Sequence, residues 1–135
     1  MQTIFELKTK LTIDMALFEQ MKKTAETELS KAETGQYTQA VVFLSAKGNE
    51  YSTYIKNALS ENMADEIALL EKMKNVNDTE ICYVLCLWQD NKCIDVPSYA
   101  FRELLCALNP KNAEALLFVM TADGVSGIKV STTMK

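Results

Sequence analysis

The sequence predicts a three-layer α/β/α sandwich built on a five-stranded mixed sheet. Segments with helical spacing of apolar side chains alternate with apolar segments rich in strand-forming residues, in the order α-β-β-α-β-α-β-β. Helices that separate strands in the middle of a chain pack on both faces of the sheet. The apolar segment 81–88 does not alternate with polar residues, which is typical of a strand covered on both faces.

Length and composition favour one globular domain over residues 1–135. The chain is 24% charged and 48% hydrophobic, as in ordinary globular proteins. Its net charge of −4 gives no general attraction to nucleic acid or anionic lipid. The first residues lack the apolar core of a signal peptide, and no segment approaches the ~20 apolar residues of a membrane span. We therefore expect a cytoplasmic protein with no nucleic-acid partner and no membrane partner.

The first half of the chain predicts a helix followed by a β-hairpin. Thr12 or Asp14 can cap a helix over residues 14–32. Two strands, 40–44 and 51–55, flank a Lys-Gly-Asn-Glu turn and form the hairpin. The apolar residues of the helix recur at intervals of four: Leu17, Met21, Ala25 and Leu29.

The middle of the chain predicts a second helix and the central strand. Ser60 can cap a helix over residues 61–74. The unbroken apolar segment 81–88 follows as the central strand. The expected apolar face of the helix consists of Met63, Ile67, Leu70 and Met73, with Ala64 and Ala68 beside them.

The last third predicts one helix and two strands. Pro97 suits the first turn of a helix, and Asn109 and Pro110 end that helix. Residues 115–121 form an apolar strand, an Asp-Gly turn follows, and residues 127–133 return as the last strand. The apolar side of the helix consists of Phe101, Leu104, Leu105 and Leu108.

Three local segments add a family resemblance. Residues 54–58 read Tyr-Ile-Lys-Asn-Ala, residues 63–66 read Met-Ala-Asp-Glu, and residues 97–104 read Pro-Ser-Tyr-Ala-Phe-Arg-Glu-Leu. With the element order, they resemble the cytidine deaminase superfamily, above all the small cytidine and blasticidin-S deaminases. That family carries Asn-Ile/Val-Glu-Asn-Ala, Cys-Ala-Glu and Pro-Cys-x-x-Cys-Arg-(Glu/Gln)-Leu at the corresponding places. The resemblance implies a cytidine deaminase-like fold.

The resemblance also implies where the zinc ligands of the family would stand. They fall on Met63, Ser98 and Phe101, which offer a thioether, a neutral hydroxyl and no donor. The chain has no histidine, and its four cysteines stand elsewhere, at 82, 86, 93 and 106, as expected of buried, reduced thiols. Asp65 aligns with the proton-shuttling Glu of the family, and using Glu66 instead restores no ligand. We expect a degenerate site without metal or other cofactor.

The nucleoside-binding side of the family site is altered as well. Tyr54 and Lys56 replace the Asn and Glu that hold the ribose in related nucleoside deaminases. Arg102 is retained from the family pattern, and Phe101 is expected to fill the space of the metal. A reshaped pocket would be lined by Tyr54, Lys56, Phe43 and Arg102, next to the degenerate positions.

The leading hypothesis is a catalytically inactive, zinc-less deaminase-like protein that acts as a binding or assembly module. Because members of the family form dimers and tetramers, the resemblance implies a homo-oligomer or a partner of an active relative. Two alternatives stay open. One is a nucleoside-analogue deaminase or other hydrolase with an atypical site that uses Asp65 and Ser98. The other is a sensor of a nucleoside-like small-molecule ligand.

Overall fold

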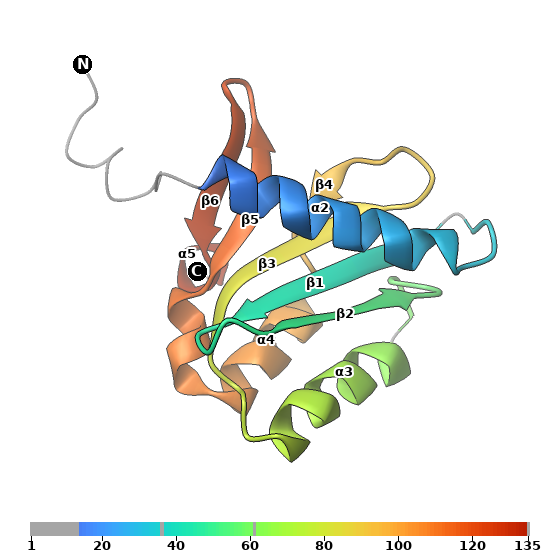
Figure 1. Ribbon diagram of the computed structural model, residues 1–135. Helices are drawn as coiled ribbons and strands as arrows, with labels where there is room; N and C mark the ends of the chain where they lie inside the picture. The colour runs from blue at the N-terminus through green and yellow to red at the C-terminus, as the bar shows by residue number, and fades with distance from the viewer. Residues whose placement is uncertain (1–13, 36, 61, 135) are drawn as a thin grey trace.

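The computed structural model describes residues 14–35, 37–60 and 62–134, and it is a three-layer α/β/α sandwich (Figure 1). The elements are α2 (Met15–Ser30), β1 (Gln39–Ser45), β2 (Glu50–Ile55), α3 (Ala64–Asn75), β3 (Ile81–Trp88), β4 (Ile94–Asp95), α4 (Tyr99–Leu108), η1 (Pro110–Glu114), β5 (Leu116–Thr121), β6 (Gly124–Lys129) and α5 (Val130–Thr133).

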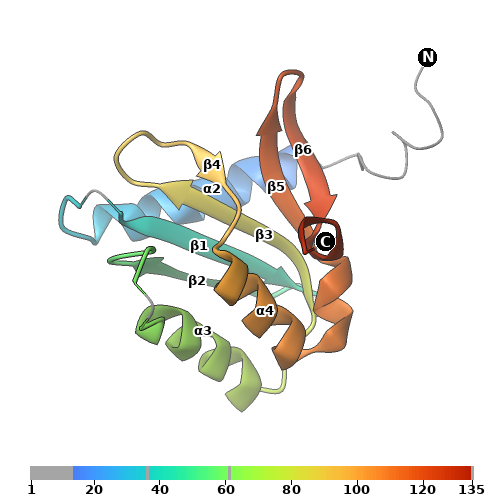
Figure 2. The ribbon, with the colours of Figure 1, turned by 180° about the vertical axis from the view of Figure 1, so that it is seen from behind.

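The sheet is mixed, as the sequence predicts. Its strands follow the order β2-β1-β3-β5-β6, and the two-residue strand β4 pairs with β3, so the described sheet has six strands instead of the expected five. β3 lies in the centre, antiparallel to β1 and parallel to β5. Helix α2 covers one face, and α3 and α4 cover the other (Figure 2).

Helix α2 confirms the first predicted helix. The side chain of Asp14 accepts hydrogen bonds from the N–H groups of Ala16 and Leu17, at 3.0 and 3.2 Å. Thr12, the alternative cap, lies outside the described residues. The helix ends at Ser30, two residues earlier than expected, and its buried side chains are Phe18, Met21, Ala25 and Leu29.

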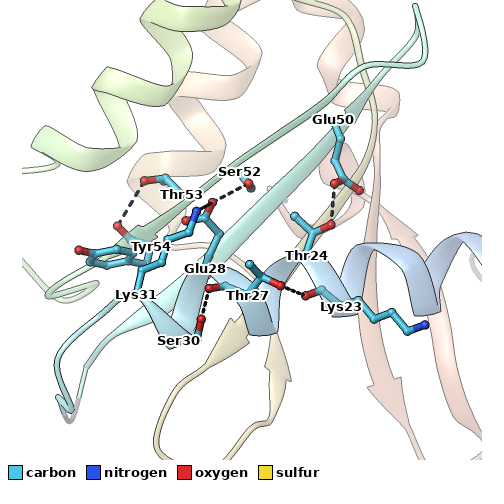
Figure 3. Close-up of polar contacts among 10 residues, drawn as sticks. All are labelled: Lys23, Thr24, Thr27, Glu28, Ser30, Lys31, Glu50, Ser52, Thr53 and Tyr54. Atoms are coloured by element: carbon cyan, nitrogen blue, oxygen red, sulfur yellow. Dashed lines mark hydrogen bonds and ion pairs between the residues drawn. The ribbon is translucent and has the colours of Figure 1, made fainter.

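Polar side chains fasten α2 to the edge strand β2 (Figure 3). Thr24 Oγ1 donates a hydrogen bond of 2.6 Å to Glu50 Oε1. Ser52 Oγ donates a hydrogen bond of 2.9 Å to Glu28 Oε1, which also lies 3.4 Å from Lys31 Nζ. The β2 side of α2 is therefore held by hydrogen bonds, while its apolar side packs on the centre of the sheet.

Strand alternation divides the buried core into two layers. Ala40 and Val42 of β1 pack in the cluster beneath α2. Val41 and Phe43 pack in the cluster with α3 and α4. The ring of Phe43 lies 5.9 Å from that of Phe101, so α4 is seated directly on β1.

The second helix starts later than the sequence suggests. Ser60 is not its cap, because Ser60 Oγ accepts from the N–H of Asn62 inside the preceding loop. The residue at the N-cap is Met63, in the left-handed conformation with φ 55° and without a side-chain cap bond. The loop uses Ser60 for its own turn, and the helix begins only after the chain reverses at Met63.

Two further boundaries differ from the prediction. Pro97 precedes α4 instead of standing in its first turn, because Ser98 is the N-cap. The last strand ends at Lys129, and residues 130–133 form the short helix α5. β5 begins at Leu116, which pairs with Lys129, so no partner strand remains for the residues beyond it.

A buried carboxylate ties the β1–β2 turn to the loop before β3. Asp78 Oδ2 accepts hydrogen bonds from Ser45 Oγ, Asn49 Nδ2 and Tyr51 OH, at 2.9, 2.9 and 2.8 Å. These donors, with the nearby charge of Lys47, lower the pKa of Asp78 despite its burial.

None of the described helices is both long and apolar enough to cross a bilayer.

Candidate functional site

A cavity of about 220 Å³ lies where the first turns of α3 and α4 meet one end of the sheet. At this end, the antiparallel pairing brings together the start of β1 and the ends of β2 and β3. The polar residues that line the cavity come from four different elements or their caps: Gln39, Glu66, Asp95, Ser98 and Arg102. Such a convergence of polar groups on a concave, partly apolar surface is typical of a small-molecule site.

Glu66 is the buried acid of this cavity. It belongs to the first turn of α3 and is only 3% exposed. Burial raises the pKa of its carboxyl group, and the neighbouring charge of Asp65 adds to the rise, while the N–H of Glu66 itself acts in the opposite direction. In the described part of the chain, no Lys or Arg forms an ion pair with Glu66. The cavity therefore holds a carboxylate without a cationic partner.

Asp65 is the acid that the sequence aligns with the proton-shuttling Glu of the family, but Glu66 is the acid that lines the cavity beside Ser98. Asp65 Oδ2 accepts from the N–H of Lys56 at 3.3 Å, and Asp65 lines an adjoining cavity of about 150 Å³ with Met63, which Glu66 also borders. Ile67 is 45% exposed, so the predicted apolar face of α3 was wrong there. The buried residues of the helix are Glu66, Leu69, Leu70 and Met73. That set also has helical spacing, and this was the signal in the sequence that could have identified Glu66.

Ser98 and Phe101 line the cavity beside Glu66, and both have structural contacts. Ser98 Oγ accepts from the N–H of Phe101 at 3.2 Å and so caps α4. Phe101 is 1% exposed and packs on Phe43. A single turn of α4 therefore supplies both the cap and a core side chain at this wall.

The other expected lining residues lie in different places. Tyr54 and Lys56 line a cavity of about 390 Å³ at the C-terminal end of α2, and Lys56 also lines the cavity of about 150 Å³ with Asp65. Tyr54 pairs with Ala40 of the α2 layer, whereas its neighbour Ile55 lines the cavity with Glu66. Alternate residues of a strand face opposite sides of the sheet, and this separates the two positions. Phe43 is fully buried beneath Phe101.

Arg102 lines the cavity, but its guanidinium group is already engaged. Nε donates to the carbonyl of Pro97 and Nη1 to the carbonyl of Thr133, both at 3.0 Å. The group also lies 5.5 Å from the centre of the Tyr99 ring. Arg102 thus joins α4 to α5 and contributes less free hydrogen-bonding capacity to the cavity than its position suggests.

Comparisons with solved structures identify the fold of the chain. No protein-family model matches the sequence, and no curated protein is significantly similar to it. The solved cytidine deaminase from Mycobacterium leprae is 16% identical over 87% of this chain and 96% of its own, with a TM-score of 0.62. The Burkholderia pseudomallei enzyme is 12% identical over 84% and 93%, with a TM-score of 0.63, and the Bacillus anthracis enzyme 11% over 87% and 86%, also with 0.63. The chain has the fold of the cytidine deaminases.

The cytidine deaminase fold implies zinc, and the residues at the helix starts do not fit that ion. Zinc binds thiolate, imidazole or carboxylate ligands. Met63 offers only a thioether, Ser98 Oγ serves as a helix cap, and Phe101 has no donor. If Glu66 is aligned with the acid of the family instead of Asp65, the first ligand position moves to Ala64, which has no donor either. Across the described residues, no three His, Cys, Asp or Glu side chains lie close enough to hold a metal ion.

The cysteines do not replace the missing ligands of the deaminase fold. All four are free thiols, and none lines the cavity that holds Glu66. Burial raises the pKa of Cys86, which keeps it a protonated thiol within the core. This deaminase-fold chain therefore has a cavity with an acid and a helix cap, but not the donor set of a zinc centre.

Proposed function

We propose that this chain is a catalytically inactive, zinc-less protein of the deaminase fold that binds a small molecule in the cavity beside Glu66 and Phe101. The observation that carries the proposal is that the cavity persists next to Phe101 although the ligand positions hold no zinc donors. A protein that had only lost its metal could fill the space completely. An open cavity with convergent polar groups supports binding instead.

The residues also offer poor alternatives for catalysis. The expected pair Asp65 and Ser98 lines two different cavities. Glu66 lies in the same cavity as Ser98, but a serine nucleophile needs a base within hydrogen-bonding reach, and no hydrogen bond joins these two side chains among the described residues. The chain has no histidine for this role. These contacts support a binding role over a hydrolytic one.

A thermal-shift panel of nucleosides, free bases and small ring compounds tests the binding role. We expect at least one compound to raise the melting temperature of the wild-type protein and not that of Ala58→Phe. Ala58 is a half-buried residue that lines the cavity, so a ring there occupies the space. Ala46→Phe, at an exposed turn outside the cavity, is the matched control and should respond like the wild type. Absence of any shift, or equal shifts in Ala58→Phe, would contradict the proposal.

Assembly into homo-oligomers, a dimer or tetramer, is the second candidate, and one surface favours it. A groove between α3 and α4 is lined by exposed Ile67 and by Leu70, Leu104 and Leu108. Glu71 and Lys74 lie in the same groove, so a second copy presents complementary charges to it. Light scattering should then show more than one chain per particle, and a monomer at high concentration would count against assembly.

A further inference from the structure

The cavity beside Glu66 continues toward the surface. A second cavity of about 240 Å³ is lined by Tyr37, Leu59, Trp88, Asp90 and Asn91. Leu59 and Trp88 line both cavities, so the two adjoin, and we call the pair the groove, with Glu66 in its inner cavity and Asp90 in its outer one. The outer cavity therefore places aromatic and acidic side chains next to a ligand seated at Glu66.

The charges along this groove are mainly negative. Glu66 and Asp95 line the inner cavity, and Asp90 lines the outer one. The salt bridges of the described residues involve Lys31, Lys111 and Lys129, all with other acids. Arg102, the cationic side chain that lines the groove, is bonded to two carbonyl groups. The described walls thus present more negative than positive charge to a ligand.

Glu66 distinguishes the groove from an ordinary acidic surface. Its side chain is 97% removed from solvent, it lines the cavity, and no other described side chain donates a hydrogen bond to it. The only described hydrogen-bond donor to this buried carboxylate is its own N–H, so part of its desolvation penalty remains, and a bound donor or cation would offset it. The first-turn position on α3 lowers this penalty, because the helix N-terminus favours negative charge.

The remaining walls suit a flat cation. Trp88 Nε1 donates to Asp95 Oδ2 at 3.0 Å and the N–H of Val96 donates to Oδ1 at 2.8 Å, so the carboxylate of Asp95 is held in place. Aromatic faces attract cations, and Trp88 and Tyr37 supply such faces along the groove. The inner cavity, about 220 Å³, is smaller than the roughly 300–1,000 Å³ of sites for drug-sized molecules, which favours a single ring.

We infer that the ligand of this groove is a small organic cation, an amidinium or ammonium group on one ring, with its charge against Glu66 and its ring toward Trp88. The inference rests on the proposed binding function and specifies the class of ligand. Glu66 would accept hydrogen bonds from the cationic N–H groups, as carboxylates do in charge-assisted pairs.

Ionisation of Glu66 would couple this binding to pH. Burial raises the pKa of Glu66, so more of the group is neutral in the free protein than for an ordinary glutamate. Affinity for a cation should therefore increase as pH rises through that pKa. The charged groups around it are Asp65 on the same helix, Lys56 after β2, Asp95 from β4 and Arg102 from α4.

Calorimetric titration with benzamidine and with its neutral analogue benzamide tests the inference. We expect benzamidine to bind, benzamide to bind at least about tenfold more weakly, and Glu66→Gln to lose at least about tenfold in benzamidine affinity, as expected for a hydrogen-bonded charge pair. Glu103→Gln, the same substitution at an exposed position outside the groove, is the control and should bind benzamidine normally. Benzamidine affinity should also rise from acidic to neutral pH in the wild type.

The outcomes separate this inference from the proposed function. If benzamide bound as tightly as benzamidine and Glu66→Gln had no effect, the inference of a cationic ligand would be wrong, while the proposed binding function would stand. Absence of benzamidine binding would also overturn the inference of a cationic ligand. Thermal shifts caused by neutral compounds and abolished by Ala58→Phe would still support the proposed function in that case. If neither compound bound and no compound of the thermal-shift panel raised the melting temperature, both the cationic ligand and the proposed binding function would be wrong.

Discussion

Phe101→Ala tests whether this side chain is part of the core at a position that the resemblance to the deaminases predicts as a zinc ligand. The ring is 1% exposed and lies 5.9 Å from the ring of Phe43. Truncation of a buried Phe to Ala costs about 3–5 kcal/mol, from lost burial and from the space left behind. We expect about 3 kcal/mol, the lower end, because one side of Phe101 already borders a cavity and the neighbouring side chains can relax into it.

Urea unfolding followed by the fluorescence of Trp88 gives this free energy. Met120→Ala is the control, because Met120 is a 58% exposed apolar residue of β5, and its loss should change stability by no more than about 0.5 kcal/mol. A loss below about 1 kcal/mol for Phe101→Ala would refute the core-filling role. The ring would then be a dispensable lining of the cavity.

Two further predictions concern the buried acids. Asp78→Ala should lower the free energy of unfolding in urea by about 2–3 kcal/mol, since three donors lose their acceptor. Asp78→Asn should lower it less, because asparagine keeps one acceptor oxygen. Because the pKa of Asp78 is lowered on folding, its contribution is present above the ordinary value of 3.8 and is lost as pH falls through the folded value; an Asp78→Asn variant with the same acid sensitivity as the wild type would contradict this. The pKa of Glu66 is raised on folding, so the wild-type protein should lose stability as pH rises above the ordinary value of 4.5. Glu66→Gln has no such group to ionise, so its stability relative to the wild type should increase over the same pH range. A relative stability independent of pH in the same unfolding series would show that Glu66 is not desolvated.

Elements set by local chemistry could be predicted from the sequence. Asp14 caps α2 as its side-chain type and position suggest. The β1–β2 hairpin and the central strand β3 follow from apolar segments and the turn between them. The predicted α/β/α layering is confirmed as well, because the order of elements leaves few ways to cover both faces of the sheet.

Features that depend on tertiary contacts were the ones missed. The face of α3 that turns inward carries Glu66, an arrangement that binary patterning disfavours because a buried carboxylate is costly. Tyr54 was expected in the cavity, but neighbouring residues of a strand point to opposite faces of the sheet, and Tyr54 lies on the α2 side. The end of β6 depends on where its partner β5 begins, which local propensity does not encode.

The zinc content of the purified protein, measured together with cytidine turnover, tests the central claim most directly. Zinc should be supplied during expression so that a working site has the opportunity to fill. We expect far less than one zinc per chain and no deamination of cytidine above the buffer rate. One zinc per chain with turnover of cytidine would contradict it, since the residues at the starts of α3 and α4 would then form a metal site that their chemistry does not provide.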